Sequence, residues 1–127
     1  MSVERKNPPG LPKPLGSYCQ AARRGNVVTT AGVAALDEAG NIVGVGDIVA
    51  QTAKTIENLR IALQSCGADL EDVLKVTCYI TDFANYRGFN EAFDTYFAGA
   101  PPARATVRAD LVLKDLLIEI DAIAVVP

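Results

Sequence analysis

The chain contains no histidine, and this absence limits the chemistry that it can perform. Histidine is the base of Ser-His-Asp and Cys-His catalytic sites, so neither arrangement is possible here. It is also the commonest zinc ligand, and we expect no metal site. Any reaction must depend on carboxylate, guanidinium, hydroxyl, backbone amide or thiol groups.

Cysteine is scarce, and the three residues Cys19, Cys66 and Cys78 lie far apart. An odd number without metal-ligand or redox spacing favours a reducing compartment, so we expect a cytoplasmic protein whose cysteines are small core residues. No apolar run reaches membrane-spanning length, and the segment Met1–Asn7 has no apolar core behind it. We therefore expect a soluble protein with no membrane partner.

Positive charge is also limited, because the chain has 12 basic and 15 acidic residues and a net charge of −3. No basic stripe is visible, which argues against a nucleic-acid partner. Apolar residues, in contrast, make up 50% of the 127 residues, and the mean hydropathy is +0.19. A single domain of this size has more apolar side chains than its interior can readily hold. We expect the surplus to lie in a subunit interface.

Prolines and turn residues divide the first third of the chain. Four of the seven prolines lie within residues 1–16, which predicts an extended arm rather than a helix or a central strand. Two strands are predicted over residues 17–23 and 26–31, joined by a tight turn around Gly25-Asn26. Residues 33–36 could extend the second strand.

The middle of the chain predicts two helices separated by a strand. Asp47 as N-cap and Gly67 as C-cap enclose apolar residues at steps of three or four, which indicates an amphipathic helix. The strand has one buried face, formed by alternate residues: Leu74, Val76, Cys78 and Ile80. The second helix, capped by Asn85, carries aromatic residues at helical spacing: Tyr86, Phe89, Phe93 and Phe97.

The last third of the chain predicts two more strands, over residues 103–112 and 116–125, with a short turn at Lys114-Asp115. The order strands, helix, strand, helix, strands is typical of an α+β fold in which two helices cover one face of a mixed sheet.

Two charged residues interrupt these last strands, Arg104 and Glu119. A charge is costly to bury unless it is paired or used, so both are candidates for a functional site. An interface salt bridge without a substrate role is the alternative. If the two strands pair as a hairpin, both residues lie near its open end. Alternation alone leaves open whether they share a face.

Five segments carry a more specific pattern, in the order Leu15–Gln20, Thr30–Gly32, Phe89–Phe93, Pro102–Val107 and Ile118–Ala124. In motif, order and spacing they resemble the reactive intermediate deaminase (RidA) family, also called the YjgF/YER057c/UK114 family. The resemblance spans nearly the whole chain and implies one domain of this family over residues 1–127, with residues 1–16 as the arm. It also implies a chorismate-mutase-like fold that assembles as a homotrimer with clefts between the subunits.

The resemblance further implies an activity. Family members with the arginine hydrolyse enamines or imines released by pyridoxal-phosphate enzymes, giving a 2-oxo acid and ammonia, and need no cofactor themselves. By motif position, Arg104 would bind the substrate carboxylate and Glu119 would hold or activate the attacking water. The other substrate-binding residues would be Tyr18 and Asn90, which line the pocket, and the backbone amides of Ala31, Gly32 and Thr106.

Elementary chemistry agrees with this division of roles. A guanidinium offers a planar fork that matches a carboxylate with two hydrogen bonds. An imine carbon is already electrophilic, so the protein need only position water and accept a proton, which a carboxylate can do.

Several positions depart from the family pattern. Ser17 and Leu113 stand where prolines are usual, which we expect to alter loop stiffness more than chemistry. Three further departures lie in the pocket: Thr106 stands where a cysteine is familiar, Ala31 where a serine is usual, and Val33 where a glutamine is common. The first excludes an activity that needs a thiol at that point. The other two make the pocket wall less polar. We expect a site that keeps its carboxylate clamp and tolerates a different, larger or more apolar substrate tail.

Two other functions stay open on the sequence alone. One is a pathway-specific catabolic deaminase with a substrate like that of the 2-aminomuconate deaminases. The other is a non-catalytic ligand-binding trimer, against which the presence of both Arg104 and Glu119 counts. Tyr18 and Asn90 also have purely structural interpretations, as a half-buried strand tyrosine and a solvent-facing polar residue.

Overall fold

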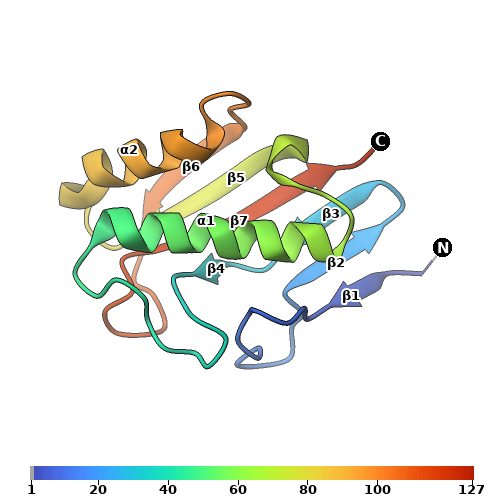
Figure 1. Cartoon of the computed structure of the whole chain (residues 1–127), viewed down its shortest axis with the longest axis horizontal. Coiled ribbons are helices and arrows are strands. Elements are labelled where there is room, and N and C mark those ends of the chain that lie inside the picture. Colours follow the sequence, from blue (N-terminus) through green and yellow to red (C-terminus); the bar gives the residue numbers. More distant parts are fainter. Residues whose placement is uncertain (1) are drawn as a thin grey trace.

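The computed structural model describes residues 2–127, which form one mixed seven-stranded sheet and two helices (Figure 1). The strands are β1 (Glu4–Lys6), β2 (Ala21–Arg24), β3 (Val27–Thr30), β4 (Val33–Ala34), β5 (Val73–Ile80), β6 (Ala103–Arg108) and β7 (Ile118–Val125). They lie in the order β1-β2-β3-β7-β5-β6, with β4 paired to β7. The β5–β6 pair is parallel, and the other pairs are antiparallel.

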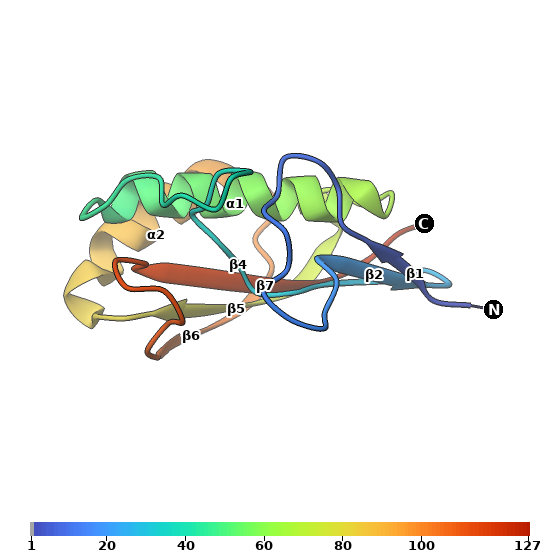
Figure 2. The ribbon, with the colours of Figure 1, turned by 90° about the horizontal axis from the view of Figure 1, so that it is seen from below.

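The helices α1 (Ile48–Ser65) and α2 (Tyr86–Phe97) lie on the same face of the sheet (Figure 2). The core fills the space between the two layers, and its largest fully buried side chains include Phe89, Phe97, Ile56, Leu59 and Leu63. No helix among residues 2–127 covers the opposite side, which we call the bare face. The predicted α+β architecture is confirmed.

The capping residues set the bounds of α1 as the sequence predicts. The side chain of Asp47 accepts a hydrogen bond from the backbone N–H of Ala50 at 3.0 Å. At the other end, Gly67 has a φ of +81°, a left-handed conformation that glycine adopts without a steric penalty. The N–H groups of Gly67 and Ala68 donate to the carbonyls of Gln64 and Leu63, which completes a Schellman motif.

The arm and the first hairpin are close to prediction. Residues 4–6 of the arm form the edge strand β1, which pairs with β2. The β2–β3 turn is the predicted Gly25-Asn26, because Arg24 and Val27 are paired directly. The predicted strand over 17–23 begins only at Ala21, since the preceding residues form bends, with the N–H of Tyr18 donating to the carbonyl of Gly16.

The predicted pairing of the last two strands is wrong. The strand β5 lies between β6 and β7, parallel to β6 and antiparallel to β7. The physical reason is that α2 joins β5 to β6, and a strand–helix–strand crossover places its two strands in parallel. The chain after β6 then leaves the edge of the sheet and returns on the far side of β5.

Two smaller predictions also need correction. Leu74 is 59% exposed rather than buried, because a bulge between Val73 and Lys75 shifts the register of β5. The side chain of Asn85 makes no capping hydrogen bond at the start of α2. Instead, Asp82 accepts a hydrogen bond from the N–H of Ala84 in the short 3-10 turn before that helix.

Candidate functional site

Three of the seven candidate site residues lie on the helix side of the sheet at its β6 edge. Arg104 is paired with Val76 and Thr106 with Cys78, and both partners point into the core. Since residues paired across neighbouring strands point to the same face, Arg104 and Thr106 share the helix side. Asn90 lies four residues after Tyr86 on α2 and one turn before Phe93, on the stripe of the helix next to Arg104.

Arg104 is held by the aromatic stripe of α2. Its Nη2 donates to the hydroxyl of Tyr86 at 3.0 Å, and its Cζ lies 5.0 Å and 4.7 Å from the ring centres of Phe89 and Phe93. A cation over aromatic faces at these distances is stabilised by the ring quadrupoles. Among residues 2–127 the hydroxyl of Tyr86 is its one hydrogen-bond partner, so most of its five N–H donors are free for a planar anion.

The other four candidates meet on the bare face. Tyr18, Ala31, Gly32 and Glu119 all line one open hollow of about 810 Å³, which we call the bare-face hollow. Glu119 points to the bare face because it is paired with Tyr79, whose neighbours Cys78 and Ile80 point into the core.

Gly32 lies directly against the carboxyl group of Glu119. A Cβ added to Gly32 would overlap a carboxylate oxygen and lie only 2.7 Å from Cδ of Glu119. Glycine therefore lets the backbone approach the carboxylate closely. The N–H of Ala31 already donates to the carbonyl of Gln20 at 2.9 Å, so the Gly32 amide is the better placed of the two for a ligand.

The environment of Glu119 raises its pKa above the usual range. Burial is the larger cause, and the negative charge of Asp121, two residues along the same face, is the second. A carboxyl group with a raised pKa holds protons more strongly, which makes it a better base than an ordinary surface glutamate.

The helix-side residues around Arg104 and the bare-face residues around Glu119 do not form one site within a single chain. Arg104 and Glu119 lie on opposite faces of the sheet, on strands separated by β5. No ion pair joins them in the part of the chain that the structure describes, so an intramolecular salt bridge does not explain either residue. Each chain instead presents an arginine half and a glutamate half.

The three cysteines differ in how deeply they are buried. Cys66 and Cys78 are core residues as predicted, and burial raises the pKa of the Cys78 thiol to about 12, which removes it as a nucleophile at neutral pH. Cys19 is only partly buried and lines the bare-face hollow, so the prediction of a core residue is wrong there. It belongs to the irregular segment that the sequence analysis assigned to a strand.

Sequence reasoning missed two residues beside these groups. It assigned Tyr86 to the apolar face of α2, but the hydroxyl group bonds Arg104; a tyrosine in a stripe of phenylalanines was the available signal. It gave no role to Val112, which lines the bare-face hollow beside Glu119 although it is 86% exposed. Residues 2–127 contain no cluster of three metal-binding side chains. Within the same residues, no helix has the length and apolar character needed to cross a membrane.

Fold and site together define a small α+β domain with two separate half-sites at the sheet surface. The family model described as Endoribonuclease L-PSP matches residues 10–126. The chain therefore belongs to this family, which is the YjgF/YER057c/UK114 or reactive intermediate deaminase family.

Three known proteins illustrate the relationship. A RutC family protein from Pyrococcus abyssi is 45% identical over 89% of each chain. The 3-aminoacrylate deaminase RutC of Acinetobacter baylyi is 38% identical over 92% of this chain and 93% of its own. The crystal structure of E. coli TdcF with bound serine superimposes with a TM-score of 0.88 at 27% identity, covering 98% of this chain and 99% of the other.

Proposed function

We propose that the protein is a hydrolytic deaminase of small carboxylate-bearing enamines and imines, of the 2-aminoacrylate and 2-iminopropionate type, which it converts to a 2-oxo acid and ammonia. The observation that carries the proposal is the pair of half-sites: an arginine with free donors, and a partly buried glutamate with a raised pKa beside a glycine amide. The relative named 3-aminoacrylate deaminase RutC acts on another small enamine that carries a carboxylate. TdcF was crystallised with serine, a ligand that carries a carboxylate.

The half-sites are joined by assembly into a homotrimer. Arg104 lies on β6, the edge strand of the sheet, where a second chain can approach. The bare face carries apolar side chains that are 39% to 51% exposed, namely Val27, Val107, Ile123 and Val125. Apolar residues exposed on an uncovered sheet are typical of a subunit interface. Each cleft then combines Arg104, Asn90 and Thr106 of one protomer with Glu119, Tyr18, Ala31 and Gly32 of its neighbour.

In this cleft Arg104 binds the substrate carboxylate through paired N–H donors. An enamine first takes a proton from solvent on carbon and becomes the protonated imine. Water adds its oxygen to the imine carbon while Glu119 accepts one of its protons, and the carbon–nitrogen π electrons become the nitrogen lone pair. Glu119 then returns this proton to nitrogen, which becomes an ammonium group. The carbon–nitrogen bond breaks and ammonia leaves with the bonding electron pair, while the hydroxyl proton passes to the Glu119 carboxylate and the O–H electrons complete the carbonyl; Glu119 finally releases the proton to solvent.

No cofactor or metal enters this scheme. RNA cleavage is not proposed despite the name of the family model, because a chain with a net charge of −3 has no excess positive charge to hold a phosphate backbone.

The direct test generates 2-iminopropionate from alanine with an amino-acid oxidase and follows ammonia release in the presence of the protein. We expect hydrolysis well above the spontaneous rate, and a loss of about a hundredfold or more in Arg104→Ala, since this side chain both binds and orients the substrate. The matched control is Arg87→Ala, because Arg87 is an exposed arginine of α2 that pairs with Glu91. Equal rates for the wild type and Arg104→Ala would contradict the proposal and favour a non-catalytic binding protein.

A further inference from the structure

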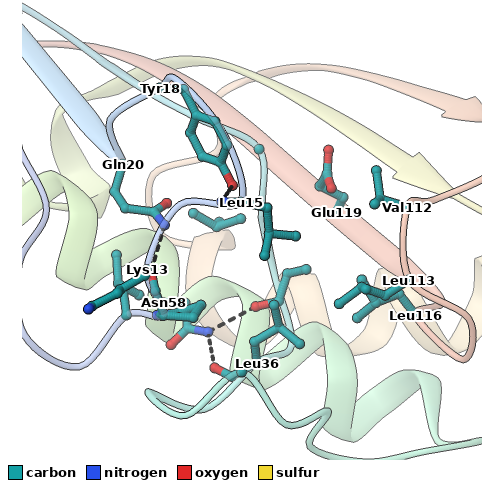
Figure 3. Close-up of a pocket in the computed structure, with 16 residues that line it drawn as sticks. Lys13, Leu15, Tyr18, Gln20, Leu36, Asn58, Val112, Leu113, Leu116 and Glu119 are labelled. Carbon is teal, nitrogen blue, oxygen red and sulfur yellow. Dashed lines mark hydrogen bonds between the residues drawn. The ribbon is translucent and has the colours of Figure 1, made fainter.

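A second cavity opens beside Glu119, and we infer that it receives the side chain of the substrate, which makes imines with a branched aliphatic or phenyl-sized tail the preferred class (Figure 3). This inference rests on the proposed deaminase function and adds the identity of the tail. We call this space the tail cavity.

The tail cavity is built by three segments that are distant in the sequence. Its volume is about 140 Å³, and its lining is mainly apolar. The arm, the segment around β4, and the loop between β6 and β7 all contribute apolar side chains, the larger of which include Leu11 and Leu15, Val33 and Leu36, and Leu113 and Leu116. Polar side chains of Lys13, Gln20 and Asn58 lie at the other end of the cavity from Glu119 (Figure 3).

The tail cavity and the bare-face hollow meet at the reacting centre. Tyr18, Gly32, Val112 and Glu119 line both spaces. A substrate whose imine carbon lies against Glu119 can therefore direct its carboxylate into the subunit cleft, toward Arg104 of the neighbouring protomer. Its remaining substituent then points into the tail cavity.

Hydrogen bonds hold the walls of the tail cavity in place. The side-chain amide of Asn58 donates to the carbonyls of Ala34 and Leu36 at 2.9 Å and 2.8 Å, which fixes the segment after β4 to α1. The amide of Gln20 donates to the carbonyl of Pro12 at 3.0 Å and fixes the arm. A cavity with fixed walls is formed before the ligand arrives, so binding costs little ordering of the protein.

The volume sets the size of the tail. An apolar cavity of about 150 Å³ is large enough to bind benzene. The single methyl group of 2-iminopropionate would leave most of the tail cavity empty, whereas an isobutyl or benzyl group would fill much of it. One methylene in an apolar pocket changes specificity by about tenfold or more. The expected preference for the longer substrate is therefore at least about tenfold.

The test measures binding separately from turnover. Isothermal titration calorimetry compares pyruvate with 4-methyl-2-oxopentanoate, the products of the methyl and isobutyl imines, and parallel assays give kcat/KM for the two imines. We expect the isobutyl compound to bind at least about tenfold more tightly and its imine to have the higher kcat/KM. The variant Leu113→Trp, which places a larger side chain into the tail cavity, should remove the difference in affinity. Leu111→Trp on the same loop, outside both cavities, should preserve it.

The outcomes separate the two proposals. Equal affinities for the two oxo acids in the wild type, or an affinity difference that Leu113→Trp leaves intact, would overturn the tail cavity even if both imines are hydrolysed. If the affinity difference is present and Leu113→Trp removes it while neither imine is hydrolysed above background, the deaminase proposal fails and the tail cavity stands as a ligand subsite.

Discussion

Arg104 and Glu119 point from opposite faces of the same sheet, Arg104 beside Val76 on the helix side and Glu119 beside Tyr79 on the bare face. One chain therefore cannot bring both to the same substrate. Any reaction that needs the two side chains must use a cleft between chains, and this requirement can be tested without a ligand-bound structure.

Complementation between two inactive variants tests the shared cleft. We expect Arg104→Ala and Glu119→Gln each to be inactive in the imine assay, because each lacks one half of every cleft. Mixed trimers, co-expressed with two different tags and purified on both, contain one cleft with an intact arginine and an intact glutamate. They should recover about a third of the wild-type rate, since one interface in three of a cyclic trimer is restored.

The control for complementation carries the two tags on the same variant and should stay inactive. Failure of the mixed trimers to recover activity would place both residues of each site in one chain, against the geometry of the sheet. Sedimentation should also give about three times the chain mass of 13.4 kDa, and a stable monomer would contradict the assembly.

The hydroxyl group of Tyr86 positions the arginine half. Tyr86→Phe keeps the aromatic stripe but removes the hydrogen bond to Arg104. A net hydrogen-bond contribution of about 0.5–1.5 kcal/mol predicts a rise of about two- to tenfold in KM. The value of kcat should change less, because carboxylate binding is shared by ground state and transition state. Tyr96→Phe is the control, since Tyr96 lies elsewhere on α2 and its hydroxyl donates to Glu57 of α1. A fall in kcat with unchanged KM would assign Tyr86 a different role.

Gly32 is required for the position of the Glu119 carboxylate. In Gly32→Ala the added Cβ collides with that carboxylate and displaces it, and displacement of a catalytic group by about 1 Å can cost about a hundredfold in rate. The φ of Gly32 is not in the left-handed region, so alanine brings no backbone strain there. Gly99→Ala is the control, because a Cβ at that position meets open space among residues 2–127. Wild-type kcat in Gly32→Ala would show that Glu119 does not act where the structure has it.

The sequence predicted the layers of the fold better than the order of its strands. Helix α1 was predictable because Asp47 and Gly67 mark its two ends with side-chain and backbone chemistry that acts locally. The position of β6 relative to β7 was not predictable, because the turn residues Lys114-Asp115 between the two strands are compatible with a hairpin. The competing constraint, the α2 crossover that places β6 beside β5, acts over a longer stretch of chain.

Prediction of the candidate site was limited in the same way, because the sequence identifies residues but not which strands pair. The sequence identified Arg104 and Glu119 because they are charges in apolar strands. It identified Gly32 because this residue belongs to the family motif Thr30–Gly32. The division of these residues between two faces depends on which strand each one joins, which alternation within a strand does not specify. The tail cavity was anticipated only through the less polar residue at Val33, because Ala31 lines the bare-face hollow instead. Its other walls come from the arm and the loop before β7, and no local pattern brings these segments together.

Asp121 offers a test of Glu119 as the titrating base. Burial raises the pKa of Glu119, and the charge of Asp121 raises it further. The base must be ionised to accept a proton from water, so activity falls as the pH drops through this pKa. In Asp121→Asn the second cause is removed and the pKa of Glu119 falls. The acidic limb of the kcat/KM profile should therefore move to lower pH, whether or not a neighbouring Arg104 also acts on Glu119.

The neighbouring tyrosine separates charge from hydrogen bonding in this test. The hydroxyl of Tyr79 donates to Oδ2 of Asp121 at 2.8 Å, and Asp121→Asn weakens this bond as well. Tyr79→Phe removes the bond and keeps the charge of Asp121. A charge effect therefore predicts that the acidic limb moves to lower pH in Asp121→Asn and not in Tyr79→Phe. If the limb stays in place in an active Asp121→Asn variant, the group that titrates is not Glu119, and the base of the reaction must be sought elsewhere in the cleft.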